Sequence, residues 1–167
     1  MMKIILMSDS HGKDENVVAV LDREMPVDAV MHMGDSQEDE EEFRLHFMGE
    51  EIELYMVAGN CDYFADFPPV RIITLEGHRI FMAHGHGYYV NFGTKDLKAA
   101  ALANGCDIAL YGHTHRPVID DKDKEILILN PGSVSFPRQE NHRASYMVME
   151  LERGRRPEVA LKYVDEL

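Results

Sequence analysis

The chain has 167 residues and a formal net charge of −13; 45% of its residues are hydrophobic and 28% are charged. This composition is typical of a soluble globular protein, and the length predicts a single domain over residues 1–167. The negative charge opposes binding to a nucleic-acid backbone, which requires clustered Lys and Arg, so extended nucleic acid is excluded as the expected substrate.

Two further observations bear on the location of the protein. No apolar stretch approaches the roughly 20 residues needed to span a bilayer, so we expect no membrane segment. Residues 1–7 run directly into Asp9 without the cleavage region of a signal peptide. Only Cys61 and Cys106 are present, which gives no sign of a disulfide framework. We therefore predict a cytoplasmic protein.

The first half of the chain is predicted to alternate strands with helices. Buried strands are expected at residues 3–7, 27–31 and 53–58, because each is a short apolar run followed by a polar, glycine-containing segment. Helices are expected at residues 14–25 and 38–48, the second ending at Gly49. In the first helix the helical spacing puts four residues on one side: Val17, Val20, Leu21 and Glu24. In the second helix it puts Phe43 and Phe47 on one side.

The pattern changes after Pro68-Pro69. Residues 71–75 and 79–83 flank a turn at 76–78 and are predicted to form a hairpin. A helix over 94–103 precedes a fifth apolar run at 107–111, and short strands are expected at 118–120, 125–129, 144–151 and 158–164. The residues therefore predict parallel pairing in the first half and antiparallel pairing in the second.

Five of the apolar runs end in residues that can bind metal ions. The endings are Ser8-Asp9-Ser10-His11-Gly12, His32-Met33-Gly34-Asp35, Gly59-Asn60-Cys61-Asp62, His84-Gly85-His86-Gly87 and Gly112-His113-Thr114-His115. Because the carboxyl ends of neighbouring strands in an open α/β sheet share one crevice, we expect these residues to meet there. One Asp-x-His or His-x-His pair would be weak evidence, but five such endings predict a binuclear metal site.

The order Asp-x-His, Gly-Asp, Gly-Asn-x-Asp, His-Gly-His, Gly-His-x-His resembles the calcineurin-like metallophosphoesterase superfamily, and the short chain resembles its small bacterial and archaeal phosphodiesterase branch. The likeness extends from Asp9 to beyond the segment Asn130-Pro131-Gly132-Ser133. It implies two mixed β-sheets packed face to face with flanking helices, a four-layer α/β/β/α fold. It also implies that one metal is held by Asp9, His11 and His115, the other by Asn60, His84 and His113, and that Asp35 bridges them.

Carboxylate, amide and imidazole ligands without thiolate favour borderline divalent ions. We expect Mn²⁺, and the same ligands suit Fe²⁺, Ni²⁺, Co²⁺ and Zn²⁺. Two ions bridged by Asp35 can hold a hydroxide that is nucleophilic at neutral pH, and both can polarise the phosphoryl oxygens. The resulting prediction is a metal-dependent phosphodiesterase in which the bridging hydroxide attacks a small organic phosphodiester.

Further residues are candidates for substrate binding and proton transfer. Asn60 is expected to touch a phosphate oxygen as well as its metal, and Arg116 and Arg138 are candidate clamps on the phosphate, with a surface salt bridge as the alternative for each. Many superfamily members carry His where this chain has Cys61, and a thiol is a poor replacement for imidazole as the acid that protonates the leaving group. His86 is the next candidate catalytic proton donor, with a packing role as its alternative.

Two other functions are kept as alternatives. A phosphomonoesterase would use the same residues, although the short chain lacks a segment to close over a phosphate dianion. A protein-interaction scaffold is the alternative of a different class, because a eukaryotic trafficking protein of this fold binds partners with a degraded metal site; the complete set of seven ligands argues against it. The expected partner is a small-molecule phosphoester, and the resemblance also suggests a homo-oligomer, a dimer or larger.

Overall fold

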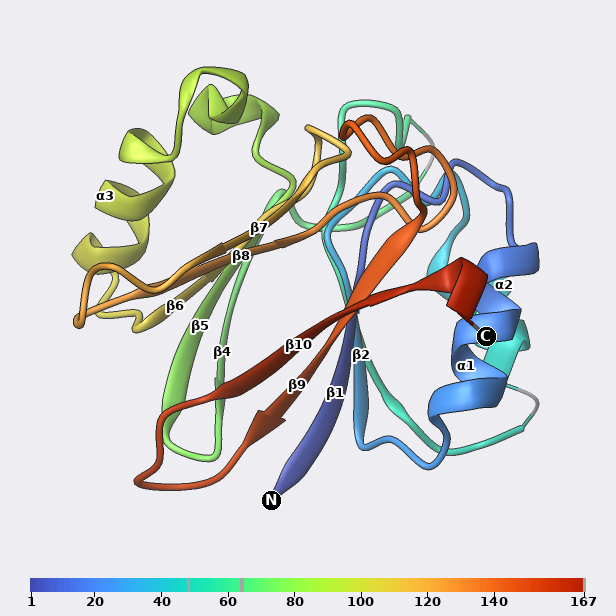
Figure 1. The fold of residues 1–167 in the computed structure, drawn as a ribbon, viewed down its shortest axis with the longest axis horizontal. Coiled ribbons are helices and arrows are strands. Elements are labelled where there is room, and N and C mark those ends of the chain that lie inside the picture. Colours follow the sequence, from blue (N-terminus) through green and yellow to red (C-terminus); the bar gives the residue numbers. More distant parts are fainter. Residues whose placement is uncertain (48, 64, 167) are drawn as a thin grey trace.

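The computed structural model describes residues 1–47, 49–63 and 65–166, and these residues form two five-stranded sheets. The strands are β1 (Met2–Met7), β2 (Ala29–His32), β3 (Glu53–Met56), β4 (Val70–Leu75), β5 (His78–Ala83), β6 (Ile108–Leu110), β7 (Pro117–Asp120), β8 (Leu127–Pro131), β9 (Ser145–Leu151) and β10 (Glu158–Tyr163). Their order is β10-β9-β1-β2-β3 in the first sheet and β4-β5-β6-β8-β7 in the second, and the sheets face each other (Figure 1).

Both sheets are mixed, as the predicted fold class requires. In the first sheet β1, β2 and β3 are parallel, while β9 pairs antiparallel with both β1 and β10. In the second sheet β5, β6 and β8 are parallel, with antiparallel β4 and β7 at the edges. The expectation of antiparallel pairing throughout the second half is therefore wrong. A helix lies between β5 and β6 in the sequence, and such a crossover allows neighbouring strands to run in parallel.

The side chains of β1 alternate between two cores because successive residues of a strand point to opposite faces. Ile4 and Leu6 pack between the sheets, with Ile80 and Met82 of β5 among their cluster. Ile5, by contrast, packs in a second cluster beneath the helices. This placement explains why β1 reads as a continuous apolar run rather than an alternating one.

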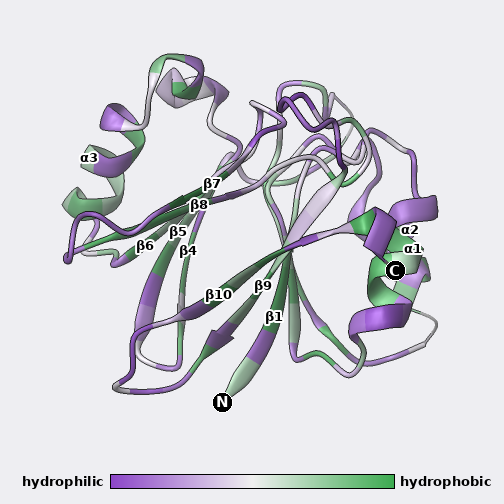
Figure 2. Ribbon diagram, in the orientation of Figure 1, coloured by the Kyte–Doolittle hydropathy of each residue, from purple (hydrophilic) through white to green (hydrophobic). Residues whose placement is uncertain are grey.

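Three helices cover the outer faces of the sheets. Helices α1 (Glu15–Glu24) and α2 (Glu40–Arg44) lie on the first sheet, and α3 (Lys95–Ala103) lies on the second (Figure 1). Helices α1 and α3 carry both hydrophilic and hydrophobic segments, whereas β1 is largely hydrophobic (Figure 2). The buried residues of α1 are the four that the helical spacing predicts, namely Val17, Val20, Leu21 and Glu24.

The second predicted helix is shorter than residues 38–48. It begins after Asp39, which forms a capping box with Glu42, and a 3₁₀ turn at Leu45–Phe47 follows it. Phe43 and Phe47 are buried as predicted. The predicted end of this helix, Met48, lies outside the described residues.

The predicted hairpin is formed by β4 and β5. Its turn consists of Glu76 and Gly77 alone, both with positive φ, while His78 pairs with Leu75 and so belongs to β5 rather than to the turn. Two central residues with positive φ match the twist that a tight hairpin needs. Within the described residues, no helix has the length and apolar character required to cross a membrane.

Candidate metal centre

The predicted metal ligands lie just beyond the carboxyl ends of five strands. Asp9 and His11 follow β1, Asp35 follows β2, Asn60 follows β3, His84 follows β5, and His113 and His115 follow β6. The expectation that neighbouring strands of one sheet supply these residues is wrong, because β1–β3 and β5–β6 belong to different sheets. The candidate centre is therefore assembled by both sheets.

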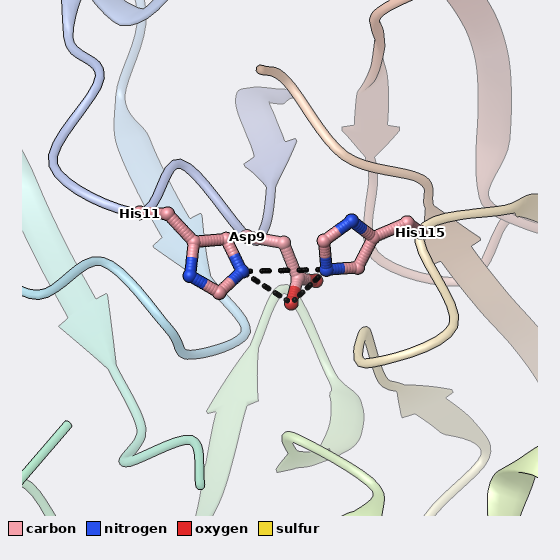
Figure 3. Close-up of side chains that lie close together, drawn as sticks. All are labelled: Asp9, His11 and His115. Carbon is pink, nitrogen blue, oxygen red and sulfur yellow. Dashed lines mark hydrogen bonds and ion pairs between the residues drawn. The ribbon is translucent and has the colours of Figure 1, made fainter. Parts of the chain in front are cut away.

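Asp9, His11 and His115 form one half of the centre (Figure 3). The Nε2 atoms of His11 and His115 lie 3.3 Å apart, and they lie 3.8 and 3.2 Å from Oδ1 of Asp9. The Asp9 side chain is fully buried. Its other oxygen, Oδ2, accepts hydrogen bonds from Ser8 Oγ and from the backbone N–H of His113, so the carboxylate is fixed with Oδ1 toward the two imidazoles.

Asp35, His84 and His113 lie in the other half. Nε2 of His84 is 3.3 Å from Oδ2 of Asp35 and 3.2 Å from Nδ1 of His113. Oδ2 of Asp35 is also 3.8 Å from Nε2 of His11, so Asp35 reaches both halves of the centre. Its second oxygen, Oδ1, is held by the backbone N–H of Cys61 at 2.8 Å.

Two of the imidazoles are anchored by backbone carbonyls. Nδ1 of His84 lies 2.7 Å from the carbonyl oxygen of Met33, and Nδ1 of His115 lies 2.6 Å from that of Phe136. A carbonyl oxygen only accepts hydrogen bonds, so each Nδ1 carries a proton. In the neutral ring, Nε2 then presents a lone pair to the carboxylates.

The other two imidazoles are anchored by side-chain amides. Nδ1 of His11 lies 3.2 Å from Oε1 of Gln37, and Nε2 of His113 lies 3.2 Å from the amide nitrogen of Asn91. In each ring the opposite nitrogen faces the centre. Holding the outer nitrogen in this way fixes the ring orientation of a metal-ligating histidine.

The arrangement fits a divalent cation. The Nε2 atoms of His11, His84 and His115 face carboxylate oxygens of Asp9 and Asp35, and Oδ1 of Asp9 is buried without a hydrogen-bond partner among the described residues. When the rings are neutral, these opposed acceptors repel one another unless a cation or a proton lies between them. Ligand bonds of about 2.0–2.2 Å place the donor atoms of one ion about 3.0–3.5 Å apart, and the shortest separations across the centre, 3.2 and 3.3 Å, lie in this range.

The electrostatic field favours positive charge at the centre. Burial raises the pKa of Asp9, but the neighbouring His115 and His84 outweigh it, and the pKa lies below its usual value. Burial likewise raises the pKa of Asp35, while His84 and the N–H of Cys61 lower it well below the usual range. Burial lowers the pKa of His84, yet Asp35 and Asp9 raise it further, so it lies above the ordinary value. Both carboxylates are therefore ionised at neutral pH.

The backbone at the centre is unusual for residues with a side chain. Five predicted ligands have a positive φ, between 49° and 67°: Asp9, His11, Asp35, His113 and His115. Asp and His tolerate this left-handed conformation better than most residues, but each instance costs about 1–3 kcal/mol. Such strain concentrates at functional sites, which supports assigning the site to these loops.

Two glycines make room for the carboxylates. A Cβ atom at Gly59 would collide with the Asp35 carboxylate, and one at Gly112 would collide with Ser8 Oγ and press on Asp9. Neither glycine has a positive φ, so their role is close approach rather than backbone freedom. The glycines of the Gly-Asn and Gly-His motifs are thus explained by the close approach of Asp35 to Gly59 and of Ser8 and Asp9 to Gly112.

Three buried polar residues tie the ligand loops together. Asp62 accepts hydrogen bonds from the backbone N–H groups of Asp35, Gln37 and Gly59, which joins the loops after β2 and β3. Asn130 donates to the carbonyl of Gly112, and Ser133 donates to the carbonyl of Asp9. The Asn130-Pro131-Gly132-Ser133 segment therefore supports the ligand loops of both sheets.

The remaining predicted site residues lie at the edge of the centre. Asn60 is exposed and its amide contacts Cys61 Sγ, with no hydrogen bond to His84 or His113 in the part of the chain that the structure describes. His86 is exposed, and its ring centroid lies 5.4 Å from that of His84. Partial burial and the neighbouring His84 lower the pKa of His86, while burial and Asp35 raise that of the Cys61 thiol.

Both predicted phosphate-binding arginines are exposed. Among the described residues, neither Arg116 nor Arg138 forms a salt bridge. Arg138 lines a pocket together with His11 and His115, whereas Arg116 does not contribute to its lining. Arg138 is therefore the better placed of the two beside the centre.

Sequence reasoning missed three residues that touch the imidazoles. Gln37 and Asn91 contact His11 and His113, and the carbonyl of Phe136 anchors His115. Gln37 lies two residues after Asp35, and this proximity to a predicted ligand is a sequence signal for its place near the centre. Asn91 lies in a short 3₁₀ turn, Val90–Phe92, after β5, where no periodic pattern assigns a face. A backbone carbonyl leaves no trace in the sequence, so neither of these two contacts was predictable.

The comparison with known families agrees with this geometry. Residues 2–154 match the model of the calcineurin-like phosphoesterase superfamily domain. The chain belongs to this superfamily. The family is one of metal-dependent phosphoesterases, so divalent metal ions and a hydrolase activity are its common features. In this protein we expect the metal ions to bind at the centre described above.

Curated relatives in bacteria carry the same family description. The probable metallophosphoesterase YsnB of Bacillus subtilis is 31% identical over 156 residues, which cover 90% of this chain and 85% of that protein. The phosphodiesterase YfcE of Escherichia coli is 40% identical over 106 residues, covering 59% of this chain and 53% of that protein. The likeness to YfcE is thus stronger in identity but limited to about half of its length.

Solved structures confirm the fold. A crystal structure from Streptococcus pneumoniae, described as a predicted phosphoesterase, is 34% identical, with a TM-score of 0.83 and coverage of 98% of this chain and 90% of that one. Vps29 of Entamoeba histolytica complexed with Zn²⁺ has a TM-score of 0.74 at 16% identity, covering 98% and 99% of the two chains. At that identity the second likeness shows the fold alone.

Proposed function

We propose that the protein, as one domain of residues 1–167, is a binuclear metal-dependent phosphodiesterase that hydrolyses a small organic phosphodiester. The observation that carries this proposal is a set of four imidazoles, each with one ring nitrogen anchored and the other facing the centre. Three of them, His11, His84 and His115, approach the buried carboxylates of Asp9 and Asp35 within 3.2–3.8 Å. Such an arrangement is costly for a protein that binds no cation.

The proposed ligand sets follow the two halves of the centre. Asp9, His11 and His115 would hold one ion, since their donor atoms form one compact group. His84 and His113, together with Asn60 at the rim, would hold the other, and Asp35 would bridge the two because Oδ2 faces both His11 and His84. Mn²⁺ is the proposed ion, and Fe²⁺, Ni²⁺, Co²⁺ or Zn²⁺ would suit the same donors.

The residues of the chain bind and orient the phosphate. When bound, two such ions supply Lewis acidity toward the phosphoryl oxygens and lower the pKa of water at the site. Arg138, which lines the pocket beside His11 and His115, would bind a non-bridging oxygen through its guanidinium. Asn60 is exposed, and its amide would touch another oxygen. His86, whose ring centroid lies 5.4 Å from that of His84, is the proposed donor of a proton to the leaving oxygen. Its pKa is lowered while that of the Cys61 thiol is raised, so the imidazolium is the stronger acid of the two.

The space around the centre favours a diester over a monoester. One pocket of about 680 Å³ opens beside His11 and His115, and another of about 380 Å³ opens beside Cys61 and Asp62. Gln37 lines both. A diester carries two substituents on phosphorus, and each pocket can accept one. A monoester would leave one of them unused.

The test compares two substrates on one enzyme. The protein is stripped of metal, reloaded with Mn²⁺, and assayed with bis-(p-nitrophenyl) phosphate and with p-nitrophenyl phosphate. We expect metal-dependent hydrolysis with a higher kcat/KM for the diester. Asp35→Ala should abolish it, whereas Asp22→Ala, a change at an exposed Asp on α1, should leave it unchanged.

Two other results of this assay would each favour one of the alternative functions. A higher kcat/KM for the monoester would support a phosphomonoesterase of the same mechanism. Absence of hydrolysis with every candidate metal would overturn the proposal and favour the scaffold. The cytoplasmic location and the homo-oligomer, a dimer or larger, remain predictions that this assay does not address.

A further inference from the structure

The larger pocket beside the centre has an aromatic residue in its wall. It is lined by His11, Gln37, His115, Ser135, Phe136, Pro137 and Arg138. Phe136 is 43% exposed, so part of its ring faces solvent beside the pocket. Its ring packs edge-on against the ring of His11, with centroids 5.6 Å apart and an interplanar angle of 83°. An apolar surface is thus held directly against a predicted metal ligand.

The position of Phe136 is fixed by the same contacts that build the centre. Its carbonyl accepts from His115 Nδ1, and its backbone N–H donates to Ser133 Oγ at 2.7 Å. Ser133 in turn binds the backbone of Asp9. The ring therefore has a defined place relative to the candidate metal ligands, as a binding surface requires and a mobile surface loop would not provide.

The charge around the pocket is positive, although the whole chain carries −13. The ammonium of Lys13 lies 5.6 Å from the centroid of the Phe136 ring, and Arg138 forms part of the wall. Within the described segments neither cation is paired with a carboxylate. A pocket with an aromatic wall and unpaired cations matches a ligand that is both flat and anionic.

We propose that this pocket is a subsite for a flat aromatic substituent of the phosphoester, an aryl group or a nucleobase, which packs against Phe136 while Arg138 and Lys13 attract the anionic part. This inference rests on the proposed function, since it places the phosphate at the centre. It adds a substrate class to that function. A phosphoester with small aliphatic substituents would leave the exposed part of the Phe136 ring uncovered.

The experiment separates the pocket from the centre by comparing two ligands that cannot be hydrolysed. Phenylphosphonate and methylphosphonate carry the same anionic group and differ only in the aromatic ring. Their dissociation constants are measured by calorimetry on the Mn²⁺-loaded protein and on Phe136→Ala. Phe92→Ala serves as the matched control, because Phe92 is 93% exposed and lies outside the pocket.

We expect the wild-type protein to bind phenylphosphonate about 3- to 10-fold more tightly than methylphosphonate, the range expected for one aromatic contact. Phe136→Ala should bring the two affinities close together by weakening only phenylphosphonate, and Phe92→Ala should preserve the wild-type ratio. Unchanged methylphosphonate binding also shows that Phe136→Ala is folded. Equal affinities in the wild type, or a ratio that survives Phe136→Ala, would overturn the subsite. Failure of both ligands to bind would instead overturn the proposed function.

Discussion

Two buried carboxylates, Glu24 and Asp9, have opposite surroundings. Glu24 is 3% exposed, and its oxygens lie 2.7 Å from Lys162 Nζ, 3.1 Å from Lys3 Nζ and 2.8 Å from the hydroxyl of Tyr146. Burial raises its pKa, but Lys162, Tyr146 and Lys3 lower it to about 2. The chain itself thus supplies the charge and the hydrogen bonds that Glu24 needs.

Asp9 is as deeply buried, but among the described residues no ammonium or guanidinium pairs with it. Its neighbours are neutral hydrogen-bond donors on one oxygen and imidazoles on the other. The comparison shows how a carboxylate with a structural role differs from one that we propose to bind a metal ion. Glu24 is neutralised within the fold, whereas Asp9 keeps one oxygen available for the proposed cation.

The largest effect is expected from Asp9→Asn. Loss of this charge should lower phosphoesterase activity of the Mn²⁺-loaded protein by at least about 1,000-fold, because several kcal/mol of metal-dependent stabilisation would be lost. In the metal-free protein the same change should destabilise the fold only slightly, since an amide N–H can donate to Nε2 of His115 in place of the attraction between His115 and the ionised carboxylate, which lowers the pKa of Asp9. Activity assays and urea unfolding without metal measure the two effects. A marked loss of metal-free stability would contradict the comparison.

The next effect is expected from Glu24→Gln, which should behave in the opposite way. The folded-state pKa of Glu24, about 2, lies below the ordinary value of 4.5, so the ionised group contributes about 3 kcal/mol above pH 4.5. This contribution should fall as the pH drops from 4.5 toward 2. Urea unfolding of both proteins at pH 7 and pH 3 should therefore show a smaller difference at pH 3, with Mn²⁺ stoichiometry unchanged. An equal difference at both pH values would show that packing, and not charge, explains the loss.

A smaller effect is expected from Asn91→Ala. Removing the amide that contacts Nε2 of His113 should weaken Mn²⁺ binding by about 10-fold, because the ring loses the contact that orients it. The fold should be unaffected, since Asn91 is exposed. Phe92→Ala on the same 3₁₀ turn is the control, and calorimetric titration with Mn²⁺ gives the comparison. Equal affinities in the two variants would remove Asn91 from the site.

The sequence predicted local features of the fold better than long-range ones. Apolar spacing located α1 and its buried side, and the ends of the runs located the residues that meet at the centre. It did not show that β5, β6 and β8 are parallel, because a buried run has the same composition in either direction. The four-layer fold followed from the family resemblance, which carries the pairing information that periodicity lacks.

The candidate site also combines residues that the sequence predicts with residues that it does not. Side chains that face the centre sit in short motifs with Gly and could be identified. Phe136 could not, because it acts through its carbonyl and through a ring exposed on an irregular segment, where no periodic pattern assigns a face. The positive φ of Asp9 and His115 was equally hidden, since these residues are not glycine and the surrounding contacts impose the conformation.

The contribution of both sheets to the centre has a consequence for the order of folding. His11 and His115 are 104 positions apart in the chain, and their rings meet only after β1 and β6 have taken their places. An ion held between them would close a loop of that length, which in the unfolded chain corresponds to about 4–5 kcal/mol of lost entropy, comparable to a long-range disulfide. The first half of the chain on its own cannot form this connection. Metal binding at the proposed centre would therefore be a late event in folding, and it would join the two sheets at the carboxyl ends of β1 and β6.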